Sequence, residues 1–118
     1  MPKFLLLYRE GQPDHEPSPA EMEAVMKDWT DWIGEGHQQG ILLDIGDALQ
    51  PQGGCVYRAD GVKSDGPYIE NKEICGGYSV AQADSIDAIE DYVRRCPSCT
   101  SGGSVEVRPM TGVGETMG

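Results

Sequence analysis

Residues 18–33 read SPAEMEAVMKDWTDWI, and this stretch predicts a long amphipathic helix. Ser18 can cap the first free amides, Pro19 suits the first helical position, and Glu21 completes a capping box. Apolar side chains then recur at every third or fourth position, which places them in one stripe. The stripe consists of Met22, Val25, Met26, Trp29, Trp32 and Ile33. We expect about 20 helical residues, ended by Gly40, with the stripe packed against a sheet.

Short apolar runs flank this helix and recur later in the chain, which predicts strands. The predicted strands are KFLLLY at 3–8, ILLDI at 41–45, ICGGYSVAQA at 74–83 and SVEVRP at 104–109. A hairpin signal at Asp60-Gly61 interrupts the middle of the chain. A second helix carries Ile86, Ile89 and Val93 and is expected to stop at Pro97. This order predicts an α+β fold of the ferredoxin-like, split βαβ type, with an antiparallel sheet and both helices on one face.

The other face of such a sheet carries apolar residues that nothing in the chain covers. We therefore expect a homodimer that pairs two sheet faces. Residues 1–118 are expected to form a single domain, with a core at about 3–110 and a flexible tail at 111–118.

The overall charge excludes some partners. The chain of 118 residues has 20 acidic and 9 basic side chains, for a net charge of −11. Such a chain repels nucleic-acid phosphates and anionic membrane surfaces. No apolar run reaches the ~20 residues of a membrane span, and the start lacks the pattern of a signal peptide. We expect a cytoplasmic protein.

Motifs for nucleotides and common hydrolases are missing from the sequence, so we expect no cofactor.

Four cysteines raise the question of thiol or metal chemistry. Cys96-Pro-Ser-Cys99 has C-x-x-C spacing, but redox pairs of this kind normally open a helix, and this one is predicted to close one. Cys55, Cys75 and the two histidines are scattered and do not complete a metal set. A thiol protein using Cys96 and Cys99 is therefore our third hypothesis, and we expect no metal.

Residues 65–73 read DGPYIENKE and begin with a turn signal. Asp65 can cap a turn through its side chain, Gly66 supplies unusual dihedrals, and Pro67 fixes the exit. These three residues are predicted to have a structural role and to direct the residues that follow.

The rest of this stretch, YIENKE, alternates polar and charged residues. If it is extended, Tyr68, Glu70 and Lys72 form a row on one side, and Glu73 points to the other. An acid beside a lysine is ionised and can bind a polar ligand or take a proton. The alternative is a solvated strand edge.

Four other residues are candidates for a site, each with a structural alternative. Trp29 either packs in the core or forms a stacking wall for a ligand. Asp47 either caps a turn or supplies a carboxylate to a cleft. Arg108 either pairs with an acid such as Glu106 or holds an anion bidentately. Tyr8, placed at the end of the first strand, could line the mouth of the same cleft.

The chain resembles the YCII-related family, and within it the DGPF subgroup. Asp65-Gly66-Pro67-Tyr68 matches the D-G-P-F tetrapeptide with Tyr in place of Phe, and Glu70, Lys72 and Glu73 match the residues that follow it. FLLLY, the leucines after the first helix, Leu49-Gln50-Pro51 and the ending EVRP also fit. The resemblance covers roughly residues 3 to 110.

This resemblance implies a dimeric α+β barrel of ferredoxin-like subunits. The YciI-like branch suggests a His–Asp pair in the cleft between the first helix and the sheet. Here Trp29 stands at the position expected for the His, and Asp47, or alternatively Asp44, is near that of the Asp. A tryptophan cannot shuttle protons, so the chain departs from that mechanism. Subgroup members are often encoded near sigma-factor-like regulators.

Two main hypotheses follow. The first is a homodimer that binds a small organic molecule in a helix–sheet cleft, with cofactor-free acid–base chemistry of the lyase, isomerase or dehalogenating kind. It predicts that Tyr68, Glu70 and Lys72 converge with Asp47 in one pocket. The second is a non-catalytic ligand-binding or protein-interaction module linked to transcriptional regulation.

Overall fold

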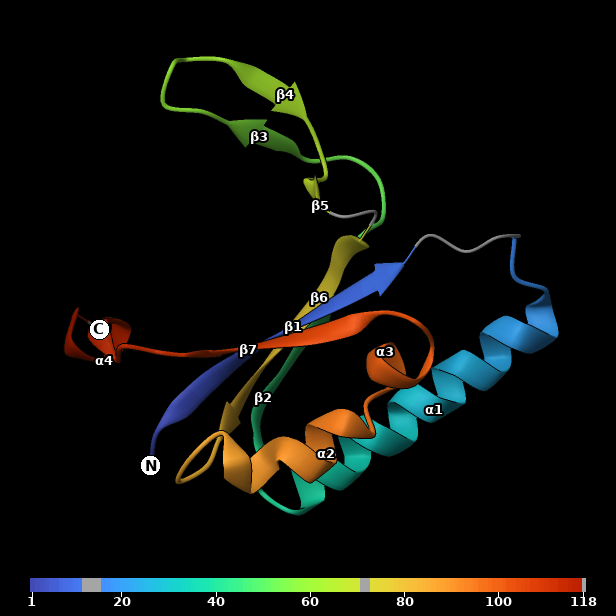
Figure 1. The fold of residues 1–118 in the computed structure, drawn as a ribbon, viewed down its shortest axis with the longest axis vertical. Helices are drawn as coiled ribbons and strands as arrows, with labels where there is room; N and C mark the ends of the chain where they lie inside the picture. The colour runs from blue at the N-terminus through green and yellow to red at the C-terminus, as the bar shows by residue number, and fades with distance from the viewer. Residues whose placement is uncertain (12–15, 71–72, 118) are drawn as a thin grey trace.

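The fold is an antiparallel sheet with helices on one face (Figure 1). We analysed a computed structural model, which describes residues 1–11, 16–70 and 73–117. The strands follow the order β2-β6-β1-β7, and each neighbouring pair is antiparallel. Their bounds are β1 Lys3–Gly11, β2 Leu42–Ala48, β6 Glu73–Gln82 and β7 Ser104–Pro109, with the short β5 Ile69–Glu70 also paired to β6. This is the strand order of a split βαβ unit, so the predicted α+β, ferredoxin-like fold is confirmed.

The predicted capping box begins the long helix α1, Pro19–Gln38. The Glu21 amide donates to Ser18 Oγ at 3.2 Å, and the Ser18 amide donates to Glu21 Oε1 at 3.3 Å. Gln39 caps the other end, and Gly40 follows with a φ of +74°. In that left-handed conformation a glycine avoids the steric cost that a side chain would bring. Local sequence thus fixes both ends of α1.

The apolar stripe of α1 packs over only part of its length. Trp32 is 5% exposed, and Trp29 and Ile33 contact the core from partly buried positions. Met22, Val25 and Met26 remain 50–63% exposed, because the first half of α1 extends beyond the strands (Figure 1). The prediction that the whole stripe packs on the sheet is therefore wrong for its first half.

An aromatic cluster joins α1 to the sheet and to the second helical region. The rings of Tyr8, Trp29 and Trp32 meet edge to face at centroid distances of 4.9–5.8 Å, and Trp32 stacks on Tyr92 at 4.3 Å. Trp32 Nε1 donates to the Tyr92 carbonyl at 2.9 Å, and Tyr92 Oη donates to the Trp32 carbonyl at 2.8 Å. Gly36 makes this approach possible, because a Cβ there would lie 2.0 Å from Tyr92 Oη.

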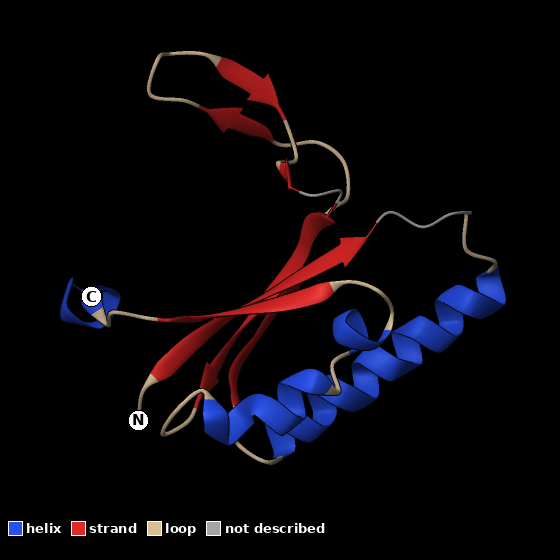
Figure 2. Ribbon diagram, in the orientation of Figure 1, coloured by secondary structure: helices blue, strands red, loops and turns tan. Residues whose placement is uncertain are grey.

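The second helical region differs from the single helix that we predicted. It consists of a 3-10 turn η1 Asp87–Ile89, α2 Glu90–Arg94 and α3 Pro97–Thr100 (Figure 2). Pro97 ends the first helix, as expected, but it also opens another, because its fixed φ suits the first helical position. Cys96 therefore precedes a helix, and our prediction that the C-x-x-C stretch closes one is incomplete.

A β-hairpin is inserted between β2 and β6 and projects from the sheet (Figure 1). Its strands are β3 Cys55–Tyr57 and β4 Lys63–Asp65, which pair only with each other. Gly61 sits in the turn with a φ of +87°, as the Asp60-Gly61 signal predicts. We call residues 55–65 the arm.

The C-terminal residues, predicted to be a flexible tail, contain the short helix α4 Val113–Met117. The Met110 amide donates to the Lys3 carbonyl at 2.9 Å, and Lys3 forms an ion pair with Glu115. These contacts tie the segment to the start of β1. Among the described residues, the helices are all too short or too polar to cross a membrane.

Candidate functional site

The turn part of DGPYIENKE behaves as predicted. Asp65 ends β4, and a bend at Gly66, with a cis peptide bond to Pro67, leads toward β5. The Gly66 amide donates to the Gly54 carbonyl at 3.1 Å, which ties this bend to the base of the arm. Asp65, Gly66 and Pro67 thus connect the arm to the sheet.

The prediction that YIENKE is one continuous strand, with Glu73 on the opposite side from Glu70, is wrong. Glu70 pairs with Glu73 and Ile69 with Ile74 in antiparallel register, so the chain reverses between Glu70 and Glu73. Residues on opposite arms of a hairpin cannot form one row along a single strand. The alternating pattern of YIENKE does not show this reversal, because it fits a single strand equally well. Lys72 lies outside the described residues.

The expected pocket of Tyr68, Glu70 and Asp47 does not form in the single chain. Along β6, Glu70 lies beside Glu73 and Asp47 beside Tyr78. Five residues of strand separate these positions by about 17 Å. Tyr68 is 61% exposed, and Asp47 is exposed as well. Within one subunit, Tyr68 and the backbone of Glu70 therefore lie away from Asp47, and the role of Lys72 stays a prediction.

Tyr8 lies within β1 and does not line a mouth, because the strand continues to Gly11. Its ring is 5% exposed and contacts Trp29. Its hydroxyl donates to Ser79 Oγ at 2.7 Å, and Ser79 Oγ donates to the Ile45 carbonyl at 2.7 Å. Burial raises the pKa of Tyr8, and the Ser79 hydrogen bond offsets only part of that rise. Tyr8 thus belongs to the core, and Trp29 packs beside it at a partly buried position.

Two other predicted residues, Asp47 and Arg108, lie on the face of the sheet opposite the helices. Side chains alternate along β1, so that Leu6 faces the helices while Leu5 and Leu7 face away. Directly paired residues of an antiparallel sheet share a face. We call the side of Leu5 and Leu7 the bare face.

The register places two cross-strand rows on the bare face. One row is Asp47, Tyr78, Leu7 and Glu106, and the next is Asp44, Val80, Leu5 and Arg108. Each row therefore has an apolar centre on β6 and β1, with charged residues on the edge strands β2 and β7. Leu5, Leu7 and Val80 are half-buried, and Tyr78 is 37% exposed.

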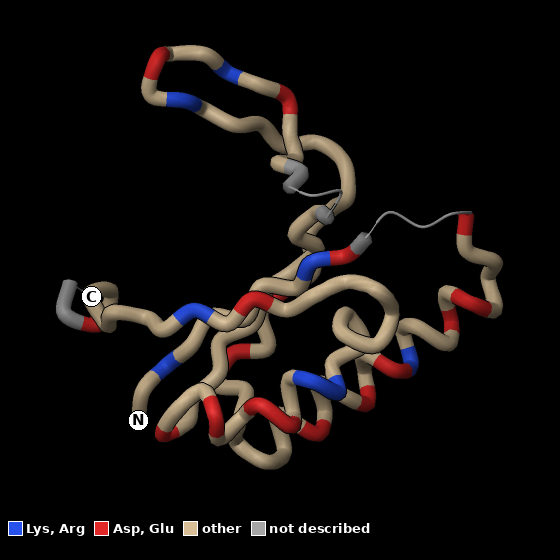
Figure 3. Tube along the Cα trace, viewed as in Figure 1, with Lys and Arg blue, Asp and Glu red and all other residues tan. Residues whose placement is uncertain are grey.

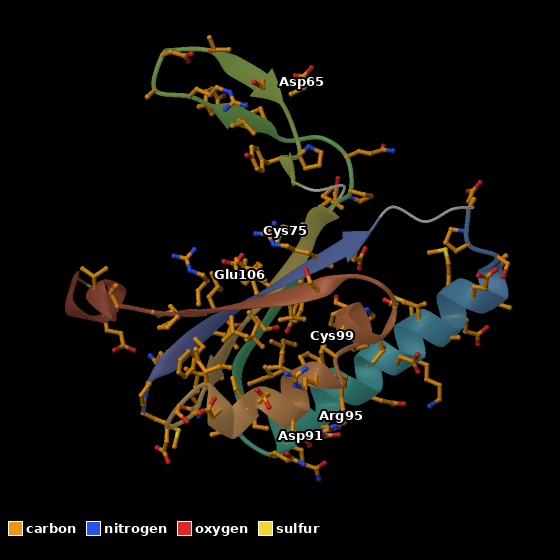
Figure 4. The ribbon with its side chains drawn as sticks, in the orientation of Figure 1. Asp65, Cys75, Asp91, Arg95, Cys99 and Glu106 are labelled. Atoms are coloured by element: carbon orange, nitrogen blue, oxygen red, sulfur yellow. The ribbon has the colours of Figure 1, made fainter. Side chains whose placement is uncertain are left out.

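The charged side chains of the bare face differ in how firmly hydrogen bonds and ion pairs hold them. Glu106 is held by Arg9, with Nη2 to Oε1 at 2.9 Å, and Arg108 Nη1 is 3.8 Å from the other Glu106 oxygen (Figure 4). This confirms the predicted Arg108–Glu106 pairing. Arg108 nevertheless stays 67% exposed. Asp47 Oδ1 accepts the Ala48 amide at 2.8 Å, and the residue is exposed.

A shallow hollow lies between α1 and the second helical region, and sequence reasoning missed it. Its volume is about 240 Å³, and it is lined by Asp28, Asp31, Trp32, Glu35, Arg95, Pro97 and Thr100. Arg95 binds both Glu35 oxygens at 2.9 and 2.6 Å, and this hydrogen bonding lowers the pKa of Glu35. The spacing of Asp28, Asp31 and Glu35 was the available signal, because residues three and four apart share a helix face. Acidic positions recur along α1 and α2 (Figure 3).

Comparison with known proteins identifies the family. A family model described as YCII-related domain matches residues 3–112. The chain belongs to the YCII-related family. This confirms the resemblance to the family, while membership of the DGPF subgroup stays a prediction.

Curated proteins gave no match to the chain. Among solved structures, it is similar to 5-chloro-2-hydroxyhydroquinone dehydrochlorinase from Burkholderia phenoliruptrix, in complex with 2,5-dihydroxybenzoquinone. The two chains are 14% identical with a TM-score of 0.44, and the match covers 92% of this chain and 93% of the other.

Proposed function

We propose that this YCII-related protein is a homodimer that binds a small organic molecule between two bare faces. The observation that carries the proposal is the shared face of Asp47, Arg108 and the uncovered apolar residues between them. An apolar sheet face left in water is unfavourable, and pairing with an identical face is the simplest way to bury it. Dimeric α+β barrels, which the family resemblance implies, pair sheets in this way.

The position of the two charged edges suggests how a site is completed. Asp47 is on β2 and Arg108 is on β7, three strand spacings apart, or about 14 Å. A two-fold axis parallel to the strands would lay β2 of one copy over β7 of the other. Such an axis keeps each row at the same position along the strands, so Asp47 would face Glu106 of the second copy and Asp44 would face Arg108. Arg108 of the second copy would then lie one row from Asp47, and a dimer would contain two equivalent sites.

The chemistry of these groups indicates the ligand class. Leu7 and Tyr78 offer an apolar and aromatic surface, while Asp47 and Arg108 offer a carboxylate and a guanidinium. This set suits a small ring compound that carries an ionisable hydroxyl or carboxyl group. If the protein is an enzyme, Asp47 would take a proton and Arg108 would stabilise the resulting anion, without a cofactor. Lyase, isomerase and dehalogenating steps all need such a proton transfer.

Binding of ring compounds tests this proposal. Hydroquinone and 4-hydroxybenzoate, as probes of the ligand class, should raise the melting temperature of the wild-type protein. Asp47→Asn and Arg108→Gln should abolish that rise. The controls Asp91→Asn and Arg94→Gln change the same residue types on α2, on the helix side, and should keep it. An equal response in all five proteins, or none in the wild type, would count against a site on the bare face.

A second candidate function rests on a different observation. Met22, Val25 and Met26 form an exposed apolar stripe on α1, in keeping with a protein-interaction module of the regulatory kind. Replacing these three residues by Ser would abolish such an interaction and leave the ring-compound response unchanged. The two functions can therefore be told apart.

A further inference from the structure

The Cys96-Pro97-Ser98-Cys99 stretch has the geometry of a disulfide-forming pair, which the proposed function does not use. Cys96 has extended backbone angles (φ −60°, ψ 138°) and precedes α3. The amides of Cys99 and Thr100 both donate to its carbonyl, at 2.9 and 3.2 Å. A turn closed by a hydrogen bond between residues i and i+3 brings their Cα atoms within about 7 Å. A disulfide needs roughly 4.4–6.8 Å, so the two cysteines lie in range of each other.

The surroundings of the stretch hold this turn in place. The hydroxyl of Ser101 donates to the Pro97 carbonyl at 2.6 Å, and the Gly103 amide donates to the Ser98 carbonyl at 2.9 Å. Pro97 and Ser98 are buried. The backbone is thus fixed independently of the sulfur atoms, and a bond between them closes a turn that already exists.

The two thiols differ in access, and this difference suggests a role for each. Cys99 is exposed and can meet a reactant in solution (Figure 4), whereas Cys96 is fully buried. An exposed thiol can, as its thiolate, attack an external disulfide, while a buried one can react only with a neighbour. The exposed cysteine would therefore react first and the buried one second.

The Cys96 site also contains groups that can assist the second step. Burial raises the pKa of the Cys96 thiol to about 11, while the amides of Ser98 and Cys99 lower it in part. The Ser98 hydroxyl is buried and makes no hydrogen bond to another described residue. It is therefore available to donate to a thiolate that forms at Cys96. Left alone, Cys96 stays a thiol at neutral pH.

We propose that Cys96 and Cys99 form a dithiol–disulfide site that exchanges with small disulfides. The Cys99 thiolate attacks one sulfur of RSSR, which forms a mixed disulfide and releases RS⁻. The Cys96 thiolate then attacks Cys99 Sγ, which forms the Cys96–Cys99 bond and releases a second RS⁻. The two protons of the cysteines end on the leaving thiolates. Overall, two cysteine thiols are oxidised to one disulfide, and RSSR is reduced to two RSH.

This site is independent of the proposed dimer. α3 packs against α1 on the helix side of the sheet, opposite the bare face (Figure 1). The exposed Cys99 therefore remains accessible when two bare faces pair.

Oxidised glutathione is the probe for this proposal. Cys55 and Cys75 are replaced by Ser in every protein tested, so that only the pair can react. After incubation with oxidised glutathione, free thiols are alkylated, and the mass of the tryptic peptide that begins at Cys96 is measured. The wild-type pair should lose two hydrogens and carry no alkyl group. Cys96→Ser should instead accumulate a glutathione adduct at Cys99, because the second step is gone. In Cys99→Ser, the buried Cys96 should carry no glutathione.

Several outcomes would overturn the site. One is a glutathione adduct that accumulates on the wild-type pair as strongly as on Cys96→Ser, because ring closure would then not occur. Another is a Cys99 that stays unmodified in every protein. Since Cys96 is buried, Cys96→Ala serves as a second variant if Cys96→Ser fails to fold, with folding checked by circular dichroism. The wild-type result alone still separates a closed disulfide from a trapped adduct.

Discussion

The two faces of the sheet are built from alternate residues of the same strands, but they are covered very differently. On the helix side, Leu6 is fully buried beneath an aromatic cluster that connects β1, α1 and α2. On the bare face, Leu5 and Leu7 are covered by nothing outside the sheet within the described residues, and both remain half-buried. One face is completed by the chain itself. The other has an apolar centre between charged edges and stays partly exposed, and this difference is the basis of the proposal that a second copy covers it.

The largest expected effect is on the helix side, at Trp32. Trp32→Ala removes a ring that packs on three aromatic neighbours and donates to the Tyr92 carbonyl. We expect the free energy of unfolding to fall by about 3–5 kcal/mol, as for large-to-small changes in cores. Urea denaturation measures this. Trp29→Ala, at a partly buried position on the same helix, is the control and should cost less; an equal loss would contradict the difference in burial.

Leu6 and Leu7 form the matched pair that tests the two faces directly. Leu6→Ala should cost about 2–5 kcal/mol at any protein concentration, because the chain itself buries this side chain. Leu7→Ala should cost about 1 kcal/mol or less in dilute protein, and its effect should grow with concentration as dimers form. Urea midpoints at two protein concentrations give both values. An effect of Leu7→Ala that is independent of concentration would show that no second copy covers the bare face.

Tyr8→Phe tests the buried hydroxyl on the helix side and has a smaller expected effect. Loss of its hydrogen bond to Ser79 should cost about 0.5–1.5 kcal/mol near neutral pH. Burial raises the pKa of Tyr8 in the fold, so the folded state favours the protonated phenol. Its contribution is complete below the unfolded-state pKa of about 10 and is lost as pH rises above that value.

The pH dependence provides the control for this prediction. The stability of the wild type should begin to fall near the unfolded-state pKa of about 10 and should fall further as the pH rises above that value. Tyr8→Phe should show a shallower fall over the same range, while Tyr57→Phe, on the exposed arm, should match the wild type. Identical profiles for wild type and Tyr8→Phe would contradict the raised pKa.

The smallest effect is expected at the Glu35–Arg95 ion pair, which lies at the surface hollow. Arg95 lowers the pKa of Glu35, so the pair stabilises the fold at neutral pH and loses that contribution as pH falls through the pKa of Glu35. Glu35→Gln should shift the urea midpoint slightly at low salt and not at high salt, because salt screens exposed pairs. A shift that is unchanged by salt would contradict an exposed location.

The fold could be predicted largely from sequence because its signals are local. The capping box at Ser18 and Glu21, the Asp60-Gly61 turn and the apolar runs each specify an element without reference to the rest of the chain. β1 pairs Tyr8 with Gly77 but Arg9 with Cys75, which leaves Gly76 as the extra residue, and a glycine inside a strand is typical of such a bulge.

The candidate site could be predicted only in part because it depends on register and on direction of the chain. A periodicity of two along YIENKE is the same for a strand and for the two halves of a short hairpin, so the reversal before Glu73 was missed. Asp47 and Arg108 were named, but their shared face follows from the pairing of β2, β6, β1 and β7, which no single segment encodes. Met22, Val25 and Met26 show the same limit: a stripe predicts an apolar face and does not predict what covers it.

The central claim is that the bare face is buried against a second copy, and the molar mass of the protein in solution tests it most directly. Sedimentation equilibrium at micromolar concentration should give twice the 12.8 kDa of one chain for the wild type. Leu7→Asp, which places a charge at the centre of that face, should give the mass of one chain, while Glu90→Gln on the helix side should stay dimeric. A wild-type protein with the mass of one chain, or a Leu7→Asp variant that remains dimeric, would contradict the account.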